Sequence, residues 1–416
     1  MKQQYDSYKP SGIDWIGDIP SHWSVMPVKH VLDNLDYLRQ PISAEDRERN
    51  NPKYDYYGAS GVIDQIDFYN VDDTVLLIGE DGANLVMRNL PLIYRASGKF
   101  WVNNHAHILK PKNGHNYSYL AHLLETGDYT LFITGSAQPK LSQENLNKYP
   151  ICIPPLAEQE AIAAWLDEKC EEIDAAIAKV DREIELIDEL KQSEISRIVT
   201  RGLNPDTPLR PSGIDWIGDI PEHWTKCRLK FIGSARNGLT YSPSDVKDSG
   251  KLVIRSSNIQ DSKLNYDDCV FVANYPETLS VNSGDTIICS RNGSINLIGK
   301  SVFIEDDMDV TFGAFMMRFR PYEHPKYSHY LLSIAISRYK GLFATTTINQ
   351  LTADSLGKME AVMPPYMEQV QIADYLDKKC AAIDGLKAKL IKKRETLTEL
   401  RQSIISEVVT GKRKVI

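Results

Sequence analysis

The sequence predicts an α+β fold, in which two mixed α/β domains are separated by two long antiparallel coiled-coil helices, with an internal pseudo-two-fold repeat. One fourteen-residue stretch occurs twice, because residues 10–23 (PSGIDWIGDIPSHW) and 211–224 (PSGIDWIGDIPEHW) differ at a single position. A Pro-Pro-x-x-Glu-Gln sequence at residues 154–159 returns at residues 364–369. A long helical pattern follows each copy of that sequence. Together these observations indicate a tandem duplication.

We name the first repeated stretch the GIDW motif and the second the Pro-Pro motif. The two GIDW motifs are 201 residues apart and the two Pro-Pro motifs 210, so the second half gains nine residues between its ends. The ends of the halves are near copies, whereas their middles have diverged almost beyond alignment. This pattern indicates a constant scaffold that carries two variable regions. We divide the chain into a first domain, a central helix, a second domain and a C-terminal helix at residues 1–157, 158–202, 203–367 and 368–416.

Composition limits the class of protein. A chain of 416 residues is too long for one ordinary core, and 42% apolar with 25% charged residues is typical of globular proteins. No apolar run approaches the roughly 18–20 residues that span a bilayer, and the N-terminal residues do not resemble a signal peptide. Six scattered cysteines without a CxxC pair or a histidine cluster indicate reduced thiols. We therefore expect a cytoplasmic protein without a membrane segment or a metal site.

The charge is unevenly spread. A formal net charge of −8 argues against a simple basic nucleic-acid binder. Residues 158–202 carry 6 Lys/Arg against 13 Asp/Glu, whereas residues 368–416 carry 11 against 7. The variable regions are close to neutral, which leaves room for a local basic face on each.

The order of elements is similar in the two halves. Residues 1–30 read as an extended segment, because their glycines and prolines break any helix. In the first variable region we expect strands at residues 74–79, 91–94 and 105–109 and a short helix at 117–124. In the second we expect a strand at residues 285–290, a turn at 291–294, a strand at 312–319 and a helix at 329–337.

Residues 158–200 and 368–410 each predict one long helix. Apolar residues that alternate in steps of four and three form the seam of a coiled coil. The first seam is Leu166, Cys170, Ile173, Ile177, Val180, Ile184 and Ile187. The second is Leu376, Cys380, Ile383, Leu390, Leu397 and Ile404, with Lys387 and Arg394 as interruptions. Roughly 43 residues at 1.5 Å each give a rod about 60 Å long. Since one helix is acidic and the other basic, we expect them to pair with each other; pairing with another chain is the alternative.

A search for catalytic motifs finds near misses. Residues 363–366 (Met-Pro-Pro-Tyr) approach the Asn-Pro-Pro-Tyr of amino-methyltransferases, but methionine replaces the amide, and the repeat copy indicates a helix boundary. Residues 294–301 approach a phosphate-binding loop, but Ser294 stands where glycine is required. His105 and His107 alternate on a strand-like segment without an acidic partner at ligand spacing, which favours a structural role. We expect a non-catalytic binding subunit whose chemistry lies in other chains.

The paired motifs, with a variable domain before each long helix, resemble the specificity (S) subunit of a type I restriction–modification system. The resemblance covers essentially the whole chain, and the combination of motifs is specific. It implies that residues 1–157 and 203–367 are target recognition domains, each of which reads one half of a split DNA site. It also implies that the paired helices fix the gap between the half-sites.

The resemblance further implies partners and cofactors. Such a subunit binds double-stranded DNA, two modification (methyltransferase) subunits and restriction (endonuclease and translocase) subunits. The chain itself would hold no cofactor, because S-adenosylmethionine, ATP and Mg²⁺ are expected in the partner subunits. Since the variable regions differ, we expect an asymmetric, bipartite DNA site.

Donor side chains on expected loops are the candidates for contacts with DNA, because such side chains read base edges and hold phosphates. To them we add the turn at residues 79–84. The candidates are Lys99, Asn103, Asn104, Gln138 and Lys140 in the first domain, and Arg255, Ser256, Asn258, Arg291, Asn292, Ser294, Asn349 and Gln350 in the second. The clusters at residues 255–258 and 291–294 are the strongest, since each groups several donors on one loop.

Two other classes of function remain open. A coiled-coil scaffold or adaptor that does not bind DNA would share the duplication and the heptads, although scaffolds seldom need two divergent domains between near-identical flanks. A stand-alone methyltransferase is disfavoured, because both the cofactor loop and the target motif are missing.

Overall fold

The computed structural model describes residues 4–47, 52–135, 138–343 and 349–415. The chain divides into two compact units: the first unit is Met1–Arg182 with Ile391–Ile416, and the second unit is Glu183–Leu390. Both boundaries lie inside long helices, α4 (Leu156–Arg201) and α7 (Tyr366–Val409). Each long helix therefore belongs to both units. The division of the chain made from the sequence, which gives each helix a segment of its own, stays a prediction.

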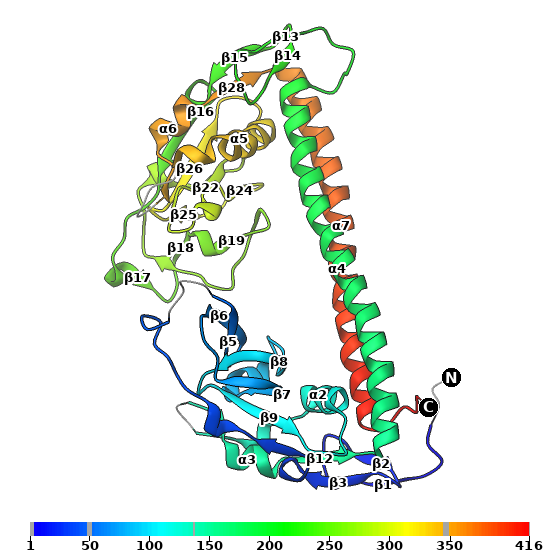
Figure 1. Cartoon of the computed structure of the whole chain (residues 1–416). Coiled ribbons are helices and arrows are strands. Elements are labelled where there is room, and N and C mark those ends of the chain that lie inside the picture. Colours follow the sequence, from blue (N-terminus) through cyan, green and yellow to red (C-terminus); the bar gives the residue numbers. More distant parts are fainter. Residues whose placement is uncertain (1–3, 48–51, 136–137, 344–348, 416) are drawn as a thin grey trace. The chain divides into compact units, whose positions relative to one another are not determined.

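The first unit is built on a mixed sheet whose described strands have the order β4-β9-β7-β8-β5-β6 (Figure 1). Strand β8 is antiparallel to β7 and parallel to β5, and α2 packs against β7 and β8. Short pairs, β1–β2, β3–β12 and β10–β11, lie outside this sheet. The strands are β1 (Tyr8–Pro10), β2 (Asp18–Pro20), β3 (Ser24–Pro27), β4 (Leu32–Asn34), β5 (Tyr54–Gly58), β6 (Gly61–Ile66), β7 (Val71–Gly79), β8 (Ile93–Val102), β9 (Ala106–Pro111), β10 (Ile133–Thr134), β11 (Lys140–Leu141) and β12 (Pro150–Ile153). The short helices are α1 (Gly82–Met87), α2 (Tyr117–Thr126) and α3 (Gln143–Lys148).

The second unit contains two described sheets in place of one, with the orders β16-β26-β22-β24 and β17-β21-β18-β25. Pairs β13–β14, β15–β28, β19–β20 and β23–β27 accompany them. The strands are β13 (Leu209–Pro211), β14 (Asp219–Pro221), β15 (Thr225–Arg228), β16 (Gly233–Asn237), β17 (Val246–Lys247), β18 (Lys251–Ile254), β19 (Ile259–Gln260), β20 (Lys263–Leu264), β21 (Phe271–Val272), β22 (Thr286–Cys289), β23 (Arg291–Asn292), β24 (Ser301–Phe303), β25 (Val310–Phe312), β26 (Met316–Pro321), β27 (Asn349–Gln350) and β28 (Glu360–Met363). The short helices are α5 (Pro325–Tyr339) and α6 (Ala353–Lys358).

The last turns of each long helix complete a core. In the first unit, Ile405 of α7 lies in the same buried cluster as Trp23 of the GIDW motif. In the second unit, Ile195 of α4 lies in the same buried cluster as Trp224 of the repeated motif. The apolar residues that made the motif recognisable in the sequence therefore hold helix ends in place.

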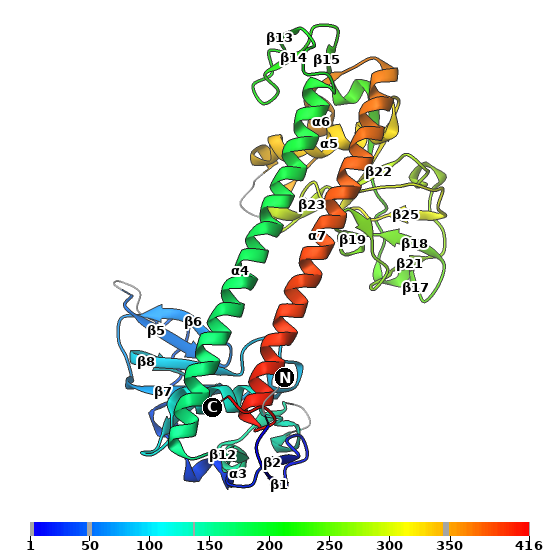
Figure 2. The same cartoon turned by 90° about the vertical axis from the view of Figure 1, so that its right-hand side faces the viewer.

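Helices α4 and α7 lie side by side and run antiparallel in both units (Figures 1 and 2). In the first unit, Arg401 pairs with Asp174 at 2.8 Å, and Arg394 with Asp181 at 3.4 Å. The two pairs are seven residues apart on each helix, which is one heptad. Arg394, which interrupts the predicted apolar seam, thus reaches a carboxylate on the facing helix.

The second unit repeats this arrangement. Lys387 pairs with Asp188 at 2.7 Å, and Lys191 pairs with Asp384 at 2.6 Å. Because these pairs are half-exposed, each adds little to stability, and together they specify which helix faces which. The prediction that the acidic and the basic helix would pair with each other is confirmed.

Most predicted elements are confirmed, and three are wrong in whole or in part. Residues 82–84 of the turn expected at residues 79–84 begin helix α1, and residues 291–292 of the turn expected at residues 291–294 form strand β23. The long helices begin and end within two residues of the expected limits. The single strand predicted for residues 312–319 is instead β25 and β26, because the chain turns at Gly313 and exposes Phe315. All six cysteines are free thiols. Among the described helices, none combines the length and the apolar character needed to cross a membrane.

Candidate nucleic-acid interface

One glutamate fastens each GIDW motif to the start of a long helix. In the first unit, the Glu158 carboxylate accepts a hydrogen bond from Trp23 Nε1 at 3.1 Å and lies 2.8 Å from His22 Nε2. In the second unit, the Glu368 carboxylate lies 2.8 Å from His223 Nε2. In each unit the GIDW motif and the Pro-Pro motif are therefore in contact. Together they form a frame that supports the variable region of that unit.

The glutamine that follows that glutamate positions a helix of each variable region. The buried Gln159 side chain accepts from the backbone N–H of Asn116 at 2.9 Å and donates to a proline carbonyl at 2.8 Å. The buried Gln369 side chain accepts from the N–H of His324 at 3.1 Å and donates to the equivalent carbonyl at 3.0 Å. Asn116 and His324 are the N-cap residues of α2 and α5. The Pro-Pro motif thus fixes both the GIDW motif and the domain that it follows.

The variable regions leave this frame at equivalent points. Strands β3 and β12 pair in the first unit with the same register as β15 and β28 in the second. The next backbone hydrogen bond is also shared, since Val28 N donates to Tyr149 O at 2.9 Å and Leu229 N donates to Met359 O at 3.0 Å. Whatever the variable regions contain, they are held at their ends in the same way.

Two loops meet beyond the end of β7 in the first domain, and we name residues 79–84 and 138–141 the first loop pair. Asp81 and Lys140 form an isolated antiparallel bridge. Leu141 N donates to Glu80 O at 2.9 Å, and Lys140 Nζ lies 2.6 Å from the Glu80 carboxylate. Residues 79–84, which connect the end of β7 to the start of α1, are therefore brought together with the candidates Gln138 and Lys140, which are distant in the sequence.

The second domain has a matching structure, the second loop pair, formed by residues 289–294 and 349–351. Strand β23 pairs with β27, so that Arg291 lies opposite Gln350 and Asn292 opposite Asn349. Leu351 N donates to the carbonyl before Arg291 at 2.7 Å. Five candidates, Arg291, Asn292, Ser294, Asn349 and Gln350, are brought together here.

The two loop pairs share one backbone register. The repeat spacing of 210 residues relates Asp81 to Arg291 and Lys140 to Gln350, and these are the residues that face each other in each domain. It also relates Glu80 to Ser290, whose carbonyl accepts the matching hydrogen bond. The backbone is thus equivalent at a place where the side chains differ in charge.

Charged groups surround the first loop pair. Arg39 Nη1 lies 3.2 Å from the Glu80 carboxylate and donates to the backbone carbonyl of the exposed candidate Asn104 at 3.2 Å. Burial acts to raise the pKa of Glu80, but hydrogen bonds from Lys140 and Arg39 and the charges of Lys140 and His107 hold that pKa below its ordinary value. Glu80 is therefore a carboxylate that holds two cations at this edge.

The buried side chains of His107 and Asp36 pair next to the first loop pair. His107 Nδ1 lies 2.6 Å from the Asp36 carboxylate, and His107 Nε2 lies 2.8 Å from the carbonyl of Leu141. Burial acts to raise the pKa of Asp36, but the hydrogen bond and charge of His107, a backbone N–H and Arg39 hold it below its ordinary value. The structural role predicted for His107 fits this position, because the ring links the sheet to the first loop pair.

Lys99 lies away from the first loop pair. It is on β8 opposite Asp72 of β7, near the strand end that is remote from Gly79. Its Nζ lies 4.6 Å from the ring centroid of Tyr69, and hydrogen bonding to that hydroxyl raises the pKa of the lysine. At about 3.4 Å per residue, roughly 24 Å of strand separates Lys99 from the first loop pair.

Three candidate asparagines are buried and hydrogen-bonded within the protein. Asn103 accepts from His105 N at 2.8 Å, and Asn349 donates to Gly293 O at 3.0 Å. Asn258 accepts from a backbone N–H at 3.0 Å and donates to two carbonyls. These side chains hold the shape of their loops, and their positions do not support the predicted contact with DNA.

The cluster at residues 255–258 is a short 3₁₀ helix, Ser256–Asn258, preceded by Arg255. The Arg255 guanidinium lies 2.8 Å from the Asp268 carboxylate and also donates to its carbonyl. Ser256 is half-buried, and its carbonyl accepts from Lys300. This cluster is therefore more committed to internal contacts than the second loop pair.

Sequence reasoning missed the residues that support the loop pairs: Asp36, Arg39 and Phe315. Asp36 is 71 residues from His107, so spacing along the chain carries no signal of their contact. Phe315 stood inside a stretch interpreted as one strand. The glycine at position 313 was the available sign of a turn that would expose it.

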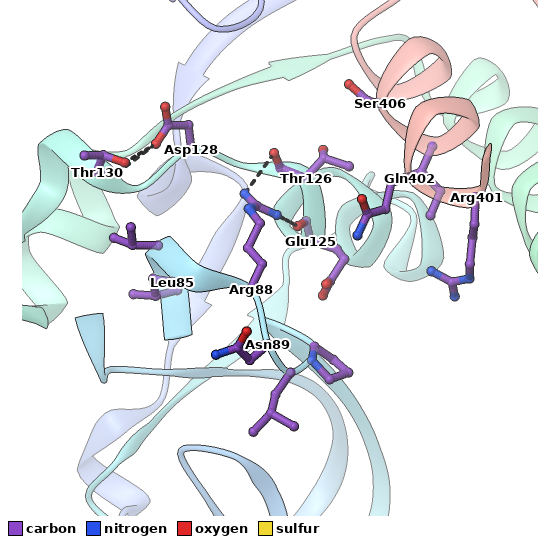
Figure 3. Close-up of a pocket in the computed structure, with 14 residues that line it drawn as sticks. Leu85, Arg88, Asn89, Glu125, Thr126, Asp128, Thr130, Arg401, Gln402 and Ser406 are labelled. Carbon is purple, nitrogen blue, oxygen red and sulfur yellow. Dashed lines mark hydrogen bonds between the residues drawn. The ribbon is translucent and has the colours of Figure 1, made fainter. Parts of the chain in front are cut away.

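A pocket of about 660 Å³ also lies in the first unit, where α2 packs against the end of α7 (Figure 3). Its polar lining is occupied by internal contacts. Arg88 donates to the carbonyl of Glu125 at 2.9 Å and so closes the end of α2, while Arg401 pairs with Asp174. The pocket belongs to the packing of the frame.

Comparison with known proteins agrees with this architecture. The family model for the type I restriction modification DNA specificity domain matches residues 20–186 and 221–394. A putative type I restriction enzyme specificity subunit of Haemophilus influenzae is 27% identical over 360 residues, which cover 85% of this chain and 86% of the relative. The EcoKI specificity subunit of Escherichia coli is 29% identical over 206 residues, 47% of this chain and 44% of that protein.

A solved structure has the same fold. It belongs to work on the structural basis of complex assembly and conformational transition of the type I R-M system. It matches this chain with a TM-score of 0.67 at 15% identity. The match covers 94% of this chain and 98% of that one.

Two variable domains on a shared frame with paired helices, together with the family match, are those of a DNA specificity subunit. The chain belongs to the type I restriction–modification DNA specificity family.

Proposed function

We propose that this chain recognises a bipartite, asymmetric DNA site and recruits methyltransferase and restriction subunits to it. The proposal rests on one observation, the equivalence of the first and the second loop pair. Each is held in the same backbone register, and each presents different polar side chains. A protein that reads two unlike half-sites needs this combination, because one frame must present two sets of donors and acceptors.

The long helices are proposed to fix the gap between the half-sites. Helix α4 has 46 residues, which is about 70 Å at 1.5 Å per residue. Half-sites read from one face of B-DNA lie about one helical turn, roughly 34–36 Å, apart or a multiple of it. A paired helix of this length is stiff enough and long enough to hold two readers at such a distance. The ion pairs between α4 and α7 keep the pairing in register.

Partners complete the activity in this proposal. Two modification subunits bind one chain, in keeping with its internal repeat, and restriction subunits join them. The chain holds no cofactor itself; S-adenosylmethionine is bound by the modification subunits, and ATP with Mg²⁺ by the restriction subunits. Near-neutral domains bind DNA when such partners add phosphate contacts. The complex acts in the cytoplasm.

The test is a map of adenine methylation across the genome of cells that carry this gene with its modification subunit. The same map is made in cells that lack only this gene. The proposal expects loss of a split, asymmetric motif on deletion, and that motif gives both half-sites and the gap. An unchanged pattern, with an active modification subunit, would contradict the proposal and favour a scaffold that does not bind DNA. A gel-shift measurement with the modification subunit present then checks that alternative.

A further inference from the structure

Arg291 has the same place in the second loop pair that Asp81 has in the first. In the first loop pair Asp81 faces Lys140, and in the second Arg291 faces Gln350. The repeat spacing relates Asp81 to Arg291. Asp81 is exposed, and Arg291 is half-buried. A site for a DNA phosphate would not tolerate a carboxylate, because the two negative charges repel. Base edges accept both residue types, since a carboxylate accepts from an exocyclic amine and a guanidinium donates to guanine. The shared position therefore fits a base edge better than a phosphate.

The guanidinium of Arg291 is uncommitted within the part of the chain that the structure describes. Its Nε is buried without a hydrogen-bond partner, and its side chain forms no ion pair with a described residue. The three other cationic candidates are engaged: Arg255 with Asp268, Lys140 with Glu80, and Lys99 with Asp72. The Nη groups of Arg291 also form no hydrogen bond with a described residue, so they are available to a ligand.

One aromatic ring contacts the same guanidinium, and hydrogen bonds anchor the backbone that carries it. It stacks over the ring of Phe315, with 5.4 Å from its central carbon to the ring centroid. The Phe315 carbonyl accepts from the backbone N–H of Arg291 at 3.1 Å and from the N–H and hydroxyl of Ser290 at 2.9 and 3.1 Å. Asn349 donates to Gly293 O and closes the turn that follows. Fixing the arginine before binding reduces the entropy cost of the contact.

A planar, fixed guanidinium matches one base edge in the major groove. Guanine presents two acceptors there, O6 and N7, at a spacing that an arginine fork satisfies with two parallel hydrogen bonds. No other base presents two acceptors on that edge. Lysine cannot copy this geometry, because its ammonium is a single point of charge.

From this geometry we infer that Arg291 reads a guanine in the half-site of the second domain, supported by Phe315. The inference rests on the proposed function, since it names one base contact of that recognition. Asp81 at the equivalent place excludes the same contact in the first half-site. The two half-sites therefore differ at this position.

The test compares methylation motifs in cells that express the modification subunit with the wild-type chain, Arg291→Ala or Arg291→Lys. The inference expects both variants to relax a single guanine of the second half-site, with about tenfold or greater loss of discrimination at that base and no change in the first half-site. Arg236→Ala is the matched control, because it removes an exposed arginine of the same domain and should leave the motif unchanged.

Two outcomes would overturn the inference. One is an unchanged motif in both variants. The other is an equal loss of methylation at all sites in both variants, measured with normal yields of the complex, because that is the effect of a lost phosphate contact or of a damaged fold. Methylation by the wild-type complex that does not depend on this chain at all would be a failure of the proposed function itself, and the wild-type arm separates the two cases.

Discussion

The two loop pairs have the same backbone register and opposite charge at the same place. In the first, Lys140 closes on Glu80, and Asp81 is exposed beside them. In the second, the equivalent positions hold the uncharged Gln350 and Ser290, and a cation, Arg291. The comparison teaches that the frame and the side chains it presents are separable. The GIDW and Pro-Pro motifs determine where the loops lie, and the variable residues determine what the loops present.

The helix pair is the part of the frame common to both units, so breaking it should have the largest effect. Ile177→Asp with Ile184→Asp places two carboxylates in the apolar seam of α4. Because an unpaired charge in such a seam is costly, we expect the free energy of unfolding to fall by about 4 kcal/mol or more. Chemical denaturation followed by circular dichroism measures the loss. Ala178→Asp, at an exposed position of the same helix, is the control. Unchanged assembly with the modification subunit and unchanged methylation by the double variant would refute the role of the helices.

Each unit should respond to acid through one histidine, because burial lowers the pKa of His122 in the first unit and of His329 in the second unit to about 4. Burial and the charges of Arg95 and Arg401 lower the pKa of His122 to about 4, against the opposing effect of Asp167. Below the ordinary histidine pKa of about 6.5 the unfolded chain gains a proton that the folded chain does not. Stability therefore falls as pH drops from about 6.5 to about 4, by at most about 3 kcal/mol at 1.36 kcal/mol per pH unit.

The second unit has Leu332 at the repeat position of His122. His122→Leu copies this residue into the first unit and should remove that part of the acid sensitivity. Urea denaturation at pH 7, 5.5 and 4.5 measures the slope of the free energy of unfolding against pH. His30→Leu, which replaces an exposed histidine, should keep the wild-type slope. An equal slope in all three proteins would show that His122 is not the sensitive group.

The Pro-Pro motifs offer a test of how equivalent the two frames are. Gln159→Leu and Gln369→Leu each leave a backbone N–H and a carbonyl without a partner in a buried place. We expect each substitution to lower the free energy of unfolding by about 1–3 kcal/mol, with about the same effect in both units. Thermal denaturation reports the loss, with the exposed Glu160→Ala as the control. A large effect in one unit and none in the other would break the equivalence.

The smallest effect is expected at the first loop pair. Lys140→Gln installs the residue of the second domain and removes the ion pair with Glu80. Because the lysine is partly exposed, the cost should be below about 1 kcal/mol. The pKa of the Glu80 carboxyl should rise toward its ordinary value, which NMR titration can follow. Lys148→Gln, which removes an exposed pair within one helix, is the control. A loss of several kcal/mol would mean that the loop pair is part of the frame.

Repetition and periodicity in the sequence predicted the frame well. Heptads predicted both long helices, because one apolar residue in every three or four must face a partner. The contact between the GIDW and Pro-Pro motifs could not be predicted in the same way. Glu158 reaches His22 across 136 residues, and only folding brings them together.

The candidate site was predicted in part. Turn chemistry indicated the segments at residues 79–84 and 291–294. Both belong to loop pairs, although residues 82–84 are helical and residues 291–292 form a strand. Residue type alone cannot tell an asparagine that faces solvent from one that holds its own loop. Asn103 and Asn258 are of the second kind, since each is buried and its amide bonds to the backbone.

The central claim is that each variable region carries its own half-site specificity on a common frame. The most direct test replaces residues 28–149 with a copy of residues 229–359, because both segments leave the frame at equivalent backbone hydrogen bonds. The methylation motif of cells carrying this chain with the modification subunit is then mapped. The account predicts that the motif becomes symmetric, an inverted repeat of the second half-site with the gap retained. A motif that keeps the original first half-site would contradict it.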